Sequence, residues 1–484
     1  MTVEELLEKL NEIQVMKCET KELEIKAARV DCPKRLYDTL SSFSNQENGG
    51  VIIFGVDEEK DYEECGVYDP QDIQKKINEQ CVQMTPKVRP LITVAEKNGS
   101  FFVSAEIPGI DIAERPCYYS GKGPMKGSYT RVGDSDEPMT DYEIYSYEAF
   151  RKKYQDDIRP VERATIGVLD NTLLADYLLR LKTEKPNLSA IDEKTILELM
   201  SITRDGHITL SSLIMFCKYP QVFFPQLCIT AVVVPGDEMG VSGESGERFL
   251  DNRRIEGNIS MMLDQAMAFV QKNMKKKTII NQDSGRRDDR TEYPITAVRE
   301  AILNTLVHRD YSIHTENSPI QIVMYSDRLE IQNPGGIYGR ISADQLGKMH
   351  PETRNPVLAT ALELLDITEN RYSGIPTIRS SMKAYGLPEP VFVDERGSFK
   401  VILYNDSNGQ TGMGDAAIEN KEEKLLSYLS YPRSRKEIAE FLGIGTVAYA
   451  MRTYIQPLID KGIIRETNPE NPRSHNQKYV RVKD

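Results

Sequence analysis

YPITAVREAILNTLVHRDY, residues 293–311, is the stretch around which the fold of this chain is organised. Apolar side chains recur through it at helical spacing, and Pro294 suits the first turn of a helix because the N–H that proline lacks would be unpaired there anyway. Glu300, Asn304 and His308 are spaced four residues apart and therefore share one face. Since buried polar groups need partners, this face is either the wall of a ligand site or a polar stripe on an ordinary core helix.

The composition is that of a globular protein. The 484 residues include 39% hydrophobic and 28% charged side chains, and a chain of this length is expected to form about two to four domains. The first residues, MTVEELLEKLNEIQ, predict an acidic amphipathic helix rather than a signal peptide. No apolar run approaches the roughly 18 residues that cross a bilayer. We therefore expect a cytoplasmic protein without a membrane partner.

Cysteine spacing and net charge exclude some kinds of structural site and restrict how the chain could bind nucleic acid. All seven cysteines lie in the first half, without a CxxC motif or a His–Cys cluster. The sequence therefore predicts neither a disulfide framework nor a zinc site. The net charge of −13 means that nucleic-acid binding would depend on local basic patches within an acidic whole.

The first 150 residues predict one α+β unit. ETKELEIK at 19–26 alternates like a half-buried strand, and a helix is predicted at 34–45. VIIFGVD at 51–57 is a nearly continuous apolar run, which indicates a central strand. A further helix and a hairpin that ends near residue 108 complete the unit.

Three segments of this unit resemble the Schlafen/AlbA-type domain in order and spacing. They are ETKELEIK, SNQENGGVIIFGVDE and RPCYYSGKGPMKGSYTRVGDSDEPMTDYEI. The family includes nucleic-acid binders in bacterial regulators and Schlafen-type endoribonucleases, and in the nucleases two glutamates and a later aspartate form a metal-dependent site. The resemblance places Glu19, Glu24 and Asp57 there, with Lys26 beside them.

Carboxylate oxygens suit hard cations such as Mn²⁺ or Mg²⁺, which can polarise a phosphodiester and activate water. The plainer alternative is a solvent-facing Glu24–Lys26 pair on a strand, with Asp57 in a turn. Because many relatives of this type resemble binders, the sequence favours binding over cleavage.

Basic and aromatic side chains are mixed in the last part of this unit, which suits a nucleic-acid backbone with unpaired bases. The predicted nucleic-acid-binding residues here are Arg115, Lys122, Lys126, Tyr129 and Arg131, with Tyr118 and Tyr119 beside them. The alternative is a glycine-rich hairpin with ordinary surface tyrosines.

Four motifs further along resemble the C-terminal region of RecG-related regulators over residues 160–405. They are EYPITAVREAILNTLVHRDYS, DRLEIQNPGG, RNPVLA and SGIPTI. That region is related to the GHKL-type ATPase fold, so the resemblance implies an α/β sandwich that binds ATP with Mg²⁺. Glu300 and Asn304 match the phosphate-side residues, with Asn304 as the Mg²⁺ ligand, and His308 follows on the same face.

NPGG at 333–336 stands where the GHKL-type fold has an Asp-x-Gly-x-Gly turn. Asn333 replaces the aspartate that reads the adenine amino group, and no long lid loop is evident, so hydrolysis is not expected. Gly335, Gly336 and Gly374, the last near the second glycine box, complete the predicted nucleotide-binding residues. These glycines could cradle phosphates or serve only tight turns. The sequence contains no P-loop and no helicase motor motif.

NDSNGQTGMGD at 405–415 predicts a linker, and residues 418–484 then predict a winged helix-turn-helix domain. Its second helix, about 445–460, would enter the major groove of DNA. The residues expected to face bases or phosphates are Thr446, Tyr449, Arg452, Thr453, Arg433, Arg435, Arg473, His475 and Lys478. A role in protein contacts or dimerisation is the alternative, which the balanced charge also fits.

The sequence therefore predicts a multidomain α+β protein with a Schlafen/AlbA-like domain at 1–150, a GHKL-like α/β sandwich at 160–405 and a C-terminal winged helix. Two predicted nucleic-acid-binding modules favour a bacterial-type DNA-binding transcriptional regulator, expected to be a homo-oligomer with DNA or RNA as its partner. The alternative function is a metal-dependent endoribonuclease that uses Glu19, Glu24 and Asp57.

Overall fold

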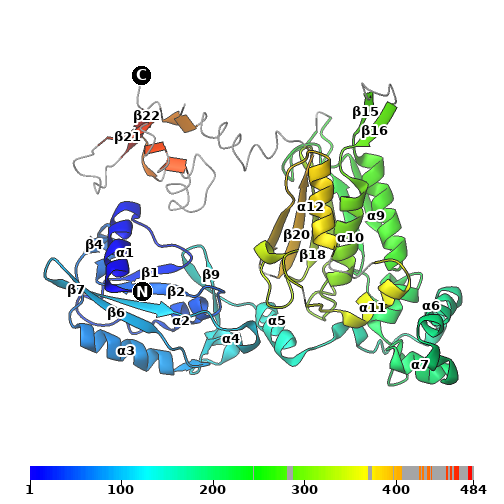
Figure 1. The fold of residues 1–484 in the computed structure, drawn as a ribbon, viewed down its shortest axis with the longest axis horizontal. Coiled ribbons are helices and arrows are strands. Elements are labelled where there is room, and N and C mark those ends of the chain that lie inside the picture. The colour runs from blue at the N-terminus through cyan, green and yellow to red at the C-terminus, as the bar shows by residue number, and fades with distance from the viewer. Residues whose placement is uncertain are drawn as a thin grey trace. The chain divides into compact units, whose positions relative to one another are not determined.

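The computed structural model describes most of the chain up to residue 405. The described ranges are 1–243, 245–280, 287–350, 352–368, 373–395 and 397–405, with short pieces at 425–426, 428–429, 433–435, 438, 454–455, 458–459, 463–467 and 478–481. The architecture is mixed α+β, as predicted, and has two compact units (Figure 1). One comprises Met1–Lys152 with Gly412–Asp484, and the other, the middle unit, is Lys153–Thr411.

The N-terminal part, Met1–Lys152, is built on a four-stranded sheet in the order β1-β2-β7-β6. Its strands are β1 (Leu23–Lys26), β2 (Gly50–Phe54), β6 (Leu91–Lys97) and β7 (Ser100–Ile107). β1 runs parallel to β2, and the other two pairings are antiparallel. The smaller elements are β3 (Val56–Asp57), β4 (Glu63–Glu64), β5 (Met84–Thr85), β8 (Tyr118–Tyr119), α4 (Pro124–Gly127), β9 (Tyr129–Val132), β10 (Ser135–Pro138) and α5 (Asp141–Lys152).

Helices cover both faces of this sheet. Ile53 of β2 packs in one cluster with α1 (Val3–Met16), whereas Ile52 and Phe54 pack in a second cluster with α2 (Tyr37–Ser44) and α3 (Pro70–Val82). Because successive side chains of a strand point to opposite faces, a strand covered on both sides must be apolar throughout. This explains the continuous VIIF run.

The middle unit contains a six-stranded sheet in the order β14-β13-β17-β18-β20-β19. Its strands are β13 (Ile229–Val233), β14 (Asp251–Ile255), β17 (Ile320–Met324), β18 (Arg328–Pro334), β19 (Val391–Glu395) and β20 (Ser398–Tyr404). β13 and β17 are parallel, and the other neighbours are antiparallel. The helices α9 (Ile259–Asn273), α10 (Ile295–His308) and α12 (Gly374–Ala384) lie side by side against it, which gives an α/β sandwich (Figure 1).

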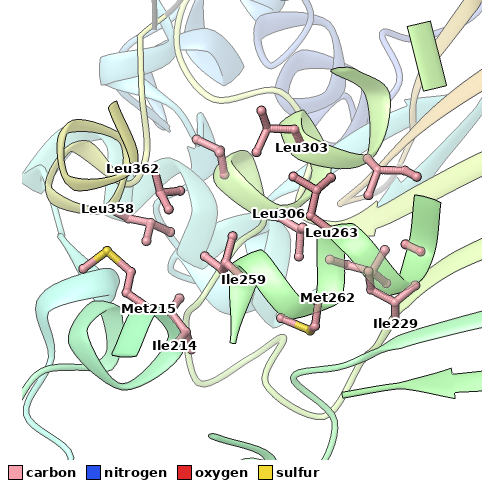
Figure 2. Close-up of a cluster of buried hydrophobic side chains, with 14 of the residues drawn as sticks. Ile214, Met215, Ile229, Ile259, Met262, Leu263, Leu303, Leu306, Leu358 and Leu362 are labelled. Carbon is pink, nitrogen blue, oxygen red and sulfur yellow. The ribbon is translucent and has the colours of Figure 1, made fainter. Parts of the chain in front are cut away.

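The remaining elements of this unit precede the sheet or connect its parts. They are α6 (Asn171–Glu184), α7 (Glu193–Leu199), β11 (Thr203–Arg204), β12 (His207–Ile208), α8 (Leu210–Phe216), the hairpin β15 (Lys276–Ile280) with β16 (Arg287–Thr291), and α11 (Pro356–Leu364). One hydrophobic core joins the four helices of this group, and Ile208 of β12, to the sandwich. Figure 2 shows Leu306 of α10 in this core with Ile259 of α9 and Leu358 of α11.

The opening stretch of the sequence is the central helix of this core. α10 buries eight side chains between Ala297 and Val307, because most of its faces are apolar. Pro294 lies one residue before the helix, at the N-cap, rather than at the first helical position. The ends of a helix predicted from a sequence pattern commonly differ by one residue from those in the structure.

The described C-terminal pieces form a small core with a short sheet. β21 (Ile464–Glu466) pairs with β22 (Tyr479–Arg481), and Arg433 bridges Tyr479 through two backbone hydrogen bonds. Most of the predicted groove-reading helix lies outside the described residues, including Thr446, Tyr449, Arg452 and Thr453, and so do Arg473 and His475. The winged helix therefore stays a prediction.

None of the helices in the described part of the chain combines the length and the apolar character needed to cross a membrane.

Candidate nucleic-acid and nucleotide sites

An aromatic stack with two cations lies on the surface of the N-terminal part. The rings of Tyr37 and Tyr119 are stacked, with centroids 4.6 Å apart. Arg35 lies 5.1 Å and Lys122 Nζ 4.7 Å from the centroid of Tyr37, and Lys122 Nζ also donates to Tyr37 Oη over 2.7 Å. That hydrogen bond raises the pKa of Lys122 and so favours its charged form. We call Arg35, Tyr37, Tyr119 and Lys122 the Tyr37 patch.

The loop that carries Tyr119 and Lys122 is shaped by close backbone packing. A side chain at Gly127 would place its Cβ 2.7 Å from the carbonyl oxygen of Tyr119, so only glycine fits there. Lys126, on the short helix α4, is exposed beside this loop. Lys122 and Lys126 are thus both available to a ligand.

Three other residues predicted to bind nucleic acid have structural roles. The side chain of Arg131 is only 1% exposed, because it pairs with Glu24 and Asp136. Tyr129 is buried beside Tyr37. Arg115 is half-buried and donates to the carbonyl oxygens of two loop residues. The burial of Arg131 and Tyr129 contradicts the prediction that they meet a phosphate, whereas contact by the half-buried Arg115 stays a prediction.

Arg35 and Tyr37 were not predicted. They lie in KRLYD at the start of α2, about 80 residues before their partners in the loop, and neither residue type marks a site by itself. The local signal is an arginine and a tyrosine two residues apart at the start of this helix. Long-range packing of α2 against the loop creates the patch.

The predicted nuclease carboxylates are held by cations. Glu24 pairs with Lys26 on the same strand, and its second oxygen lies 2.8 Å from Arg131 Nη1. Glu19 accepts a hydrogen bond from the backbone N–H of Ile25 over 2.7 Å. Burial, followed by the charge of Glu24, raises the pKa of Glu19 to about 7.

Asp57, on a strand that contacts β1, has a different cationic partner. Its carboxylate is 3.5 Å from Lys60 Nζ, and its charge acts on the thiol of Cys65. Glu58, the next residue, is the further acid that acts on Glu19 and Lys26. No group of three or more histidine, cysteine, aspartate or glutamate side chains in the described residues could hold a metal ion. In the structure Glu24 and Asp57 are therefore held in ion pairs.

The polar face of α10 meets the start of α12 in the middle unit. A Cβ built on Gly374 would lie 2.5 Å from Glu300 Oε1 and 2.8 Å from Asn304 Nδ2. Glycine therefore lets the first residue of α12 approach both side chains closely. The structure brings Glu300, Asn304 and Gly374 together, although they are far apart in the sequence.

The NPGG turn is packed against a buried ion pair. Gly335 has φ +100°, and a Cβ there would lie 2.3 Å from Arg354 Nη1 and 2.7 Å from Asp310 Cβ. Arg354 Nη1 is in turn 3.2 Å from Asp310 Oδ2. Asn333, at the end of β18, is 3% exposed on the face that meets α10. Arg354 and Asp310 were missed because the sequence does not show which residues surround a turn.

His308 and Asp394 both lie near Arg354, beside this turn. Both side chains are exposed to solvent, yet desolvation, with Arg354 nearby, lowers the pKa of His308 to about 4. Desolvation also raises the pKa of Asp394, and a Cβ on Gly336 would lie 2.5 Å from Asp394 Oδ1. His308 is therefore neutral near pH 7 and next to the glycine turn.

Two of the described basic residues in the C-terminal segment contact tyrosine side chains. Arg433 lies over the ring of Tyr428, and Arg435 Nε donates to Tyr479 Oη over 3.0 Å. Lys478 is exposed at the start of β22. Whether they meet DNA remains a prediction, as does the role of Tyr449 and Arg452.

Comparison with known proteins assigns domains to two parts of this α+β chain. A family described as "Schlafen, AlbA_2" matches residues 19–140. A family described as "Putative ATP-dependent DNA helicase recG C-terminal" matches 317–403. The chain therefore carries a Schlafen/AlbA_2 domain and a RecG C-terminal, HATPase-like domain, as the sequence predicted. α10 lies just before the second matched range.

The end of the chain matches a third family. Residues 421–481 match "Filamentation induced by cAMP protein Fic-like, C-terminal domain". No curated protein matches the chain.

Two solved structures show distant similarity. The DIP2311 protein from Corynebacterium diphtheriae is 17% identical, with 99% of this chain and 97% of that chain covered and a TM-score of 0.40. The N-terminal domain of a putative ATP-dependent DNA helicase RecG-related protein from Nitrosomonas europaea is 27% identical, covering 29% of this chain and 94% of that chain, with a TM-score of 0.23. Neither superposition is close enough to support a structural conclusion.

Proposed function

We propose that the chain is a nucleic-acid-binding transcriptional regulator. In this proposal the Schlafen/AlbA_2 domain holds DNA or RNA, the HATPase-like domain responds to a nucleotide and supports self-association, and the C-terminal segment adds a second DNA contact. The two matched domains support the nucleic-acid and nucleotide parts of the proposal.

The Tyr37 patch is the observation that carries this proposal. Lys122 and Arg35 present positive charge over an aromatic ring, and Lys126 lies exposed nearby. Cations that neutralise phosphates supply most of non-specific nucleic-acid affinity, and aromatic rings beside them add contacts to sugars and bases. Because the chain as a whole is acidic, nucleic-acid binding would require a local positive patch. The Tyr37 patch is such a feature.

Fluorescence anisotropy of labelled oligouridine, oligothymidine and duplex DNA with the full-length chain tests the proposal. We expect binding that weakens with salt, and we expect Lys122→Ala and Lys126→Ala each to lower the salt slope by roughly 0.7–0.9, the loss of one phosphate contact. Lys75→Ala is the matched control, because Lys75 is an exposed lysine on α3 of the same part. Equal effects of all three substitutions, or no binding at all, would exclude the patch as a nucleic-acid-binding site.

Metal-dependent cleavage is a second candidate, and the observation in its favour is Glu19. A carboxyl whose pKa is raised to about 7 beside other acids is typical of functional sites as well as of structural networks. The pairing of Glu24 with Arg131 and Lys26 favours the structural role. Gel analysis of labelled RNA and DNA incubated with Mn²⁺ decides, since cleavage that is lost in Glu24→Gln would establish the nuclease.

The middle unit has residues that fit ATP with Mg²⁺ on the phosphate side. The amide oxygen of Asn304 is a suitable Mg²⁺ ligand, and the adjacent N-terminus of α12 favours phosphate. On the base side Asn333 has a carboxamide, which can both donate and accept, in place of a carboxylate. Bound nucleotide would favour one conformational state of the domain. We therefore propose that the domain senses the nucleotide and does not hydrolyse it.

A further inference from the structure

We infer that Asn45 and Gln80 are positioning residues of the nucleic-acid site, each holding one of the two segments that form the Tyr37 patch. The inference rests on the proposed function, because it assumes that the patch binds nucleic acid. Both residues are carboxamides, and neither belongs to the patch itself.

Asn45 holds the loop that carries Tyr119 and Lys122. It lies at the C-terminal end of α2 and is 6% exposed. Its Nδ2 donates to the carbonyl oxygens of Cys117 over 3.0 Å and of Tyr129 over 3.1 Å, and its Oδ1 accepts from the N–H of Cys117 over 2.7 Å. One side chain therefore fixes both ends of the 117–129 loop.

Gln80 holds the other segment in the same manner. From α3, its Oε1 accepts from the N–H of Leu36 over 2.9 Å, and its Nε2 donates to the carbonyl oxygen of Pro33 over 2.8 Å. These two bonds bracket Arg35 and lie immediately before Tyr37. The two clamps are thus independent of each other, since they start from different helices and hold different segments.

The chemistry of the clamps requires an amide. Each side chain donates through its nitrogen and accepts through its oxygen, whereas a carboxylate of the same shape only accepts. Asn45→Asp and Gln80→Glu therefore keep the volume and replace hydrogen bonds by repulsion between oxygens, at two carbonyl groups for Asn45 and at one for Gln80. A loop that is no longer held must be ordered when the ligand binds, which reduces affinity without removing any ligand contact.

A double-mutant cycle on the full-length chain with labelled oligouridine tests the inference. We expect Asn45→Asp to raise the Kd about threefold to tenfold, the cost of ordering one or two side chains. We expect Lys122→Ala to cost much less in the Asn45→Asp background than alone, because a loosened loop no longer places Lys122 over Tyr37. Gln80→Glu should show the same coupling with Arg35→Ala.

Ser42→Ala is the matched control. Ser42 is equally buried on the same helix, but it bonds Asp136 and the carbonyl oxygen of Thr39 rather than the loop. It should show additive behaviour with Lys122→Ala. Circular dichroism confirms that each variant is folded, and Gln80→Glu carries the test where Asn45→Asp does not fold.

The outcomes separate the two claims. Binding that is unchanged by Lys122→Ala and Arg35→Ala would overturn the proposed function of the patch. Binding that depends on Lys122 and Arg35, but shows strictly additive effects with folded Asn45→Asp and Gln80→Glu, would overturn the positioning role and leave the proposed function standing.

Discussion

Arg131 and Glu24 form a buried ion pair, with Arg131 Nη1 2.8 Å from Glu24 Oε2 and the two side chains 1% and 8% exposed. The guanidinium also lies 3.0 Å from Asp136 Oδ1 and donates to backbone carbonyls of Thr20 and Leu23. Two strands that are distant in the sequence, β1 and β9, are thereby joined by one side chain. A residue type that usually marks a nucleic-acid surface here stabilises the fold.

Arg131→Ala should destabilise the N-terminal part strongly. Removing one partner of a buried pair leaves an uncompensated charge and typically costs about 3–5 kcal/mol. Urea-induced unfolding, followed by circular dichroism because the chain has no tryptophan, measures the change. Lys126→Ala, at an exposed site, should change the free energy of unfolding by less than about 0.5 kcal/mol. Similar stability of the two variants would contradict the role given to Arg131.

Glu19 should make the N-terminal part less stable as the pH rises from about 4.5 to about 7. Its folded-state pKa is about 7 against an ordinary value of 4.5, since burial and Glu24 disfavour the charge. A raised pKa of an acid means that the folded state binds the proton more tightly, so stability is lost on ionisation.

At pH 8 the free energy of unfolding of Glu19→Gln should therefore exceed that of the unaltered chain by roughly 1–3 kcal/mol. At pH 4 the two free energies should differ little. Comparing the two chains at each pH cancels the contribution of other groups. An effect of Glu19→Gln that is the same at both pH values would contradict the raised pKa.

The sequence predicted elements whose pattern is local. The apolar run of β2 and the helical periodicity of α10 were both confirmed, because strand and helix spacing depend only on neighbouring residues. The spacing of Glu300 and Asn304 placed them on one face of α10, and the structure shows that both side chains lie close to Gly374.

Features that depend on long-range packing were not predicted. Arg131 has the same sequence signature as an exposed arginine, and only the approach of β9 to β1 buries it. Tyr37 gains its role from stacking on Tyr119 in a distant loop. Asp57 was chosen for its place at the end of a strand, whereas Glu58, one residue later, is the acid that acts on Glu19 after Glu24.

Asn304→Ala should abolish nucleotide binding by the middle unit. The amide is adjacent to the first residue of α12, where Mg²⁺ and phosphates would be held. Isothermal titration with ATP and Mg²⁺ should give heat for the unaltered chain and none for the variant. Thr296→Ala is the control, because Thr296 is exposed on the same helix. Absence of heat with the unaltered chain, or equal heat with Asn304→Ala, would contradict the nucleotide-sensing proposal.

Gly335→Ala should destabilise the middle unit more than an ordinary glycine substitution. Positive φ at a non-glycine residue costs about 1 kcal/mol, and here the new Cβ would also lie 2.3 Å from Arg354 Nη1 and 2.7 Å from Asp310 Cβ. Because both atoms belong to a buried ion pair, the neighbours must shift together, and we expect a total loss of roughly 2–4 kcal/mol.

Gly386→Ala separates the cost of backbone strain from the cost of the steric clash. Gly386 has φ +61° with nothing within 4 Å of the added Cβ, so this substitution should cost only the backbone strain of about 1 kcal/mol. Urea-induced unfolding of the two variants gives the difference directly, and Gly335→Ala should also abolish any heat of ATP binding while Gly386→Ala leaves it unchanged. Equal destabilisation by the two substitutions would show that the NPGG turn needs glycine only for its backbone conformation, and that Arg354 and Asp310 can move away without cost.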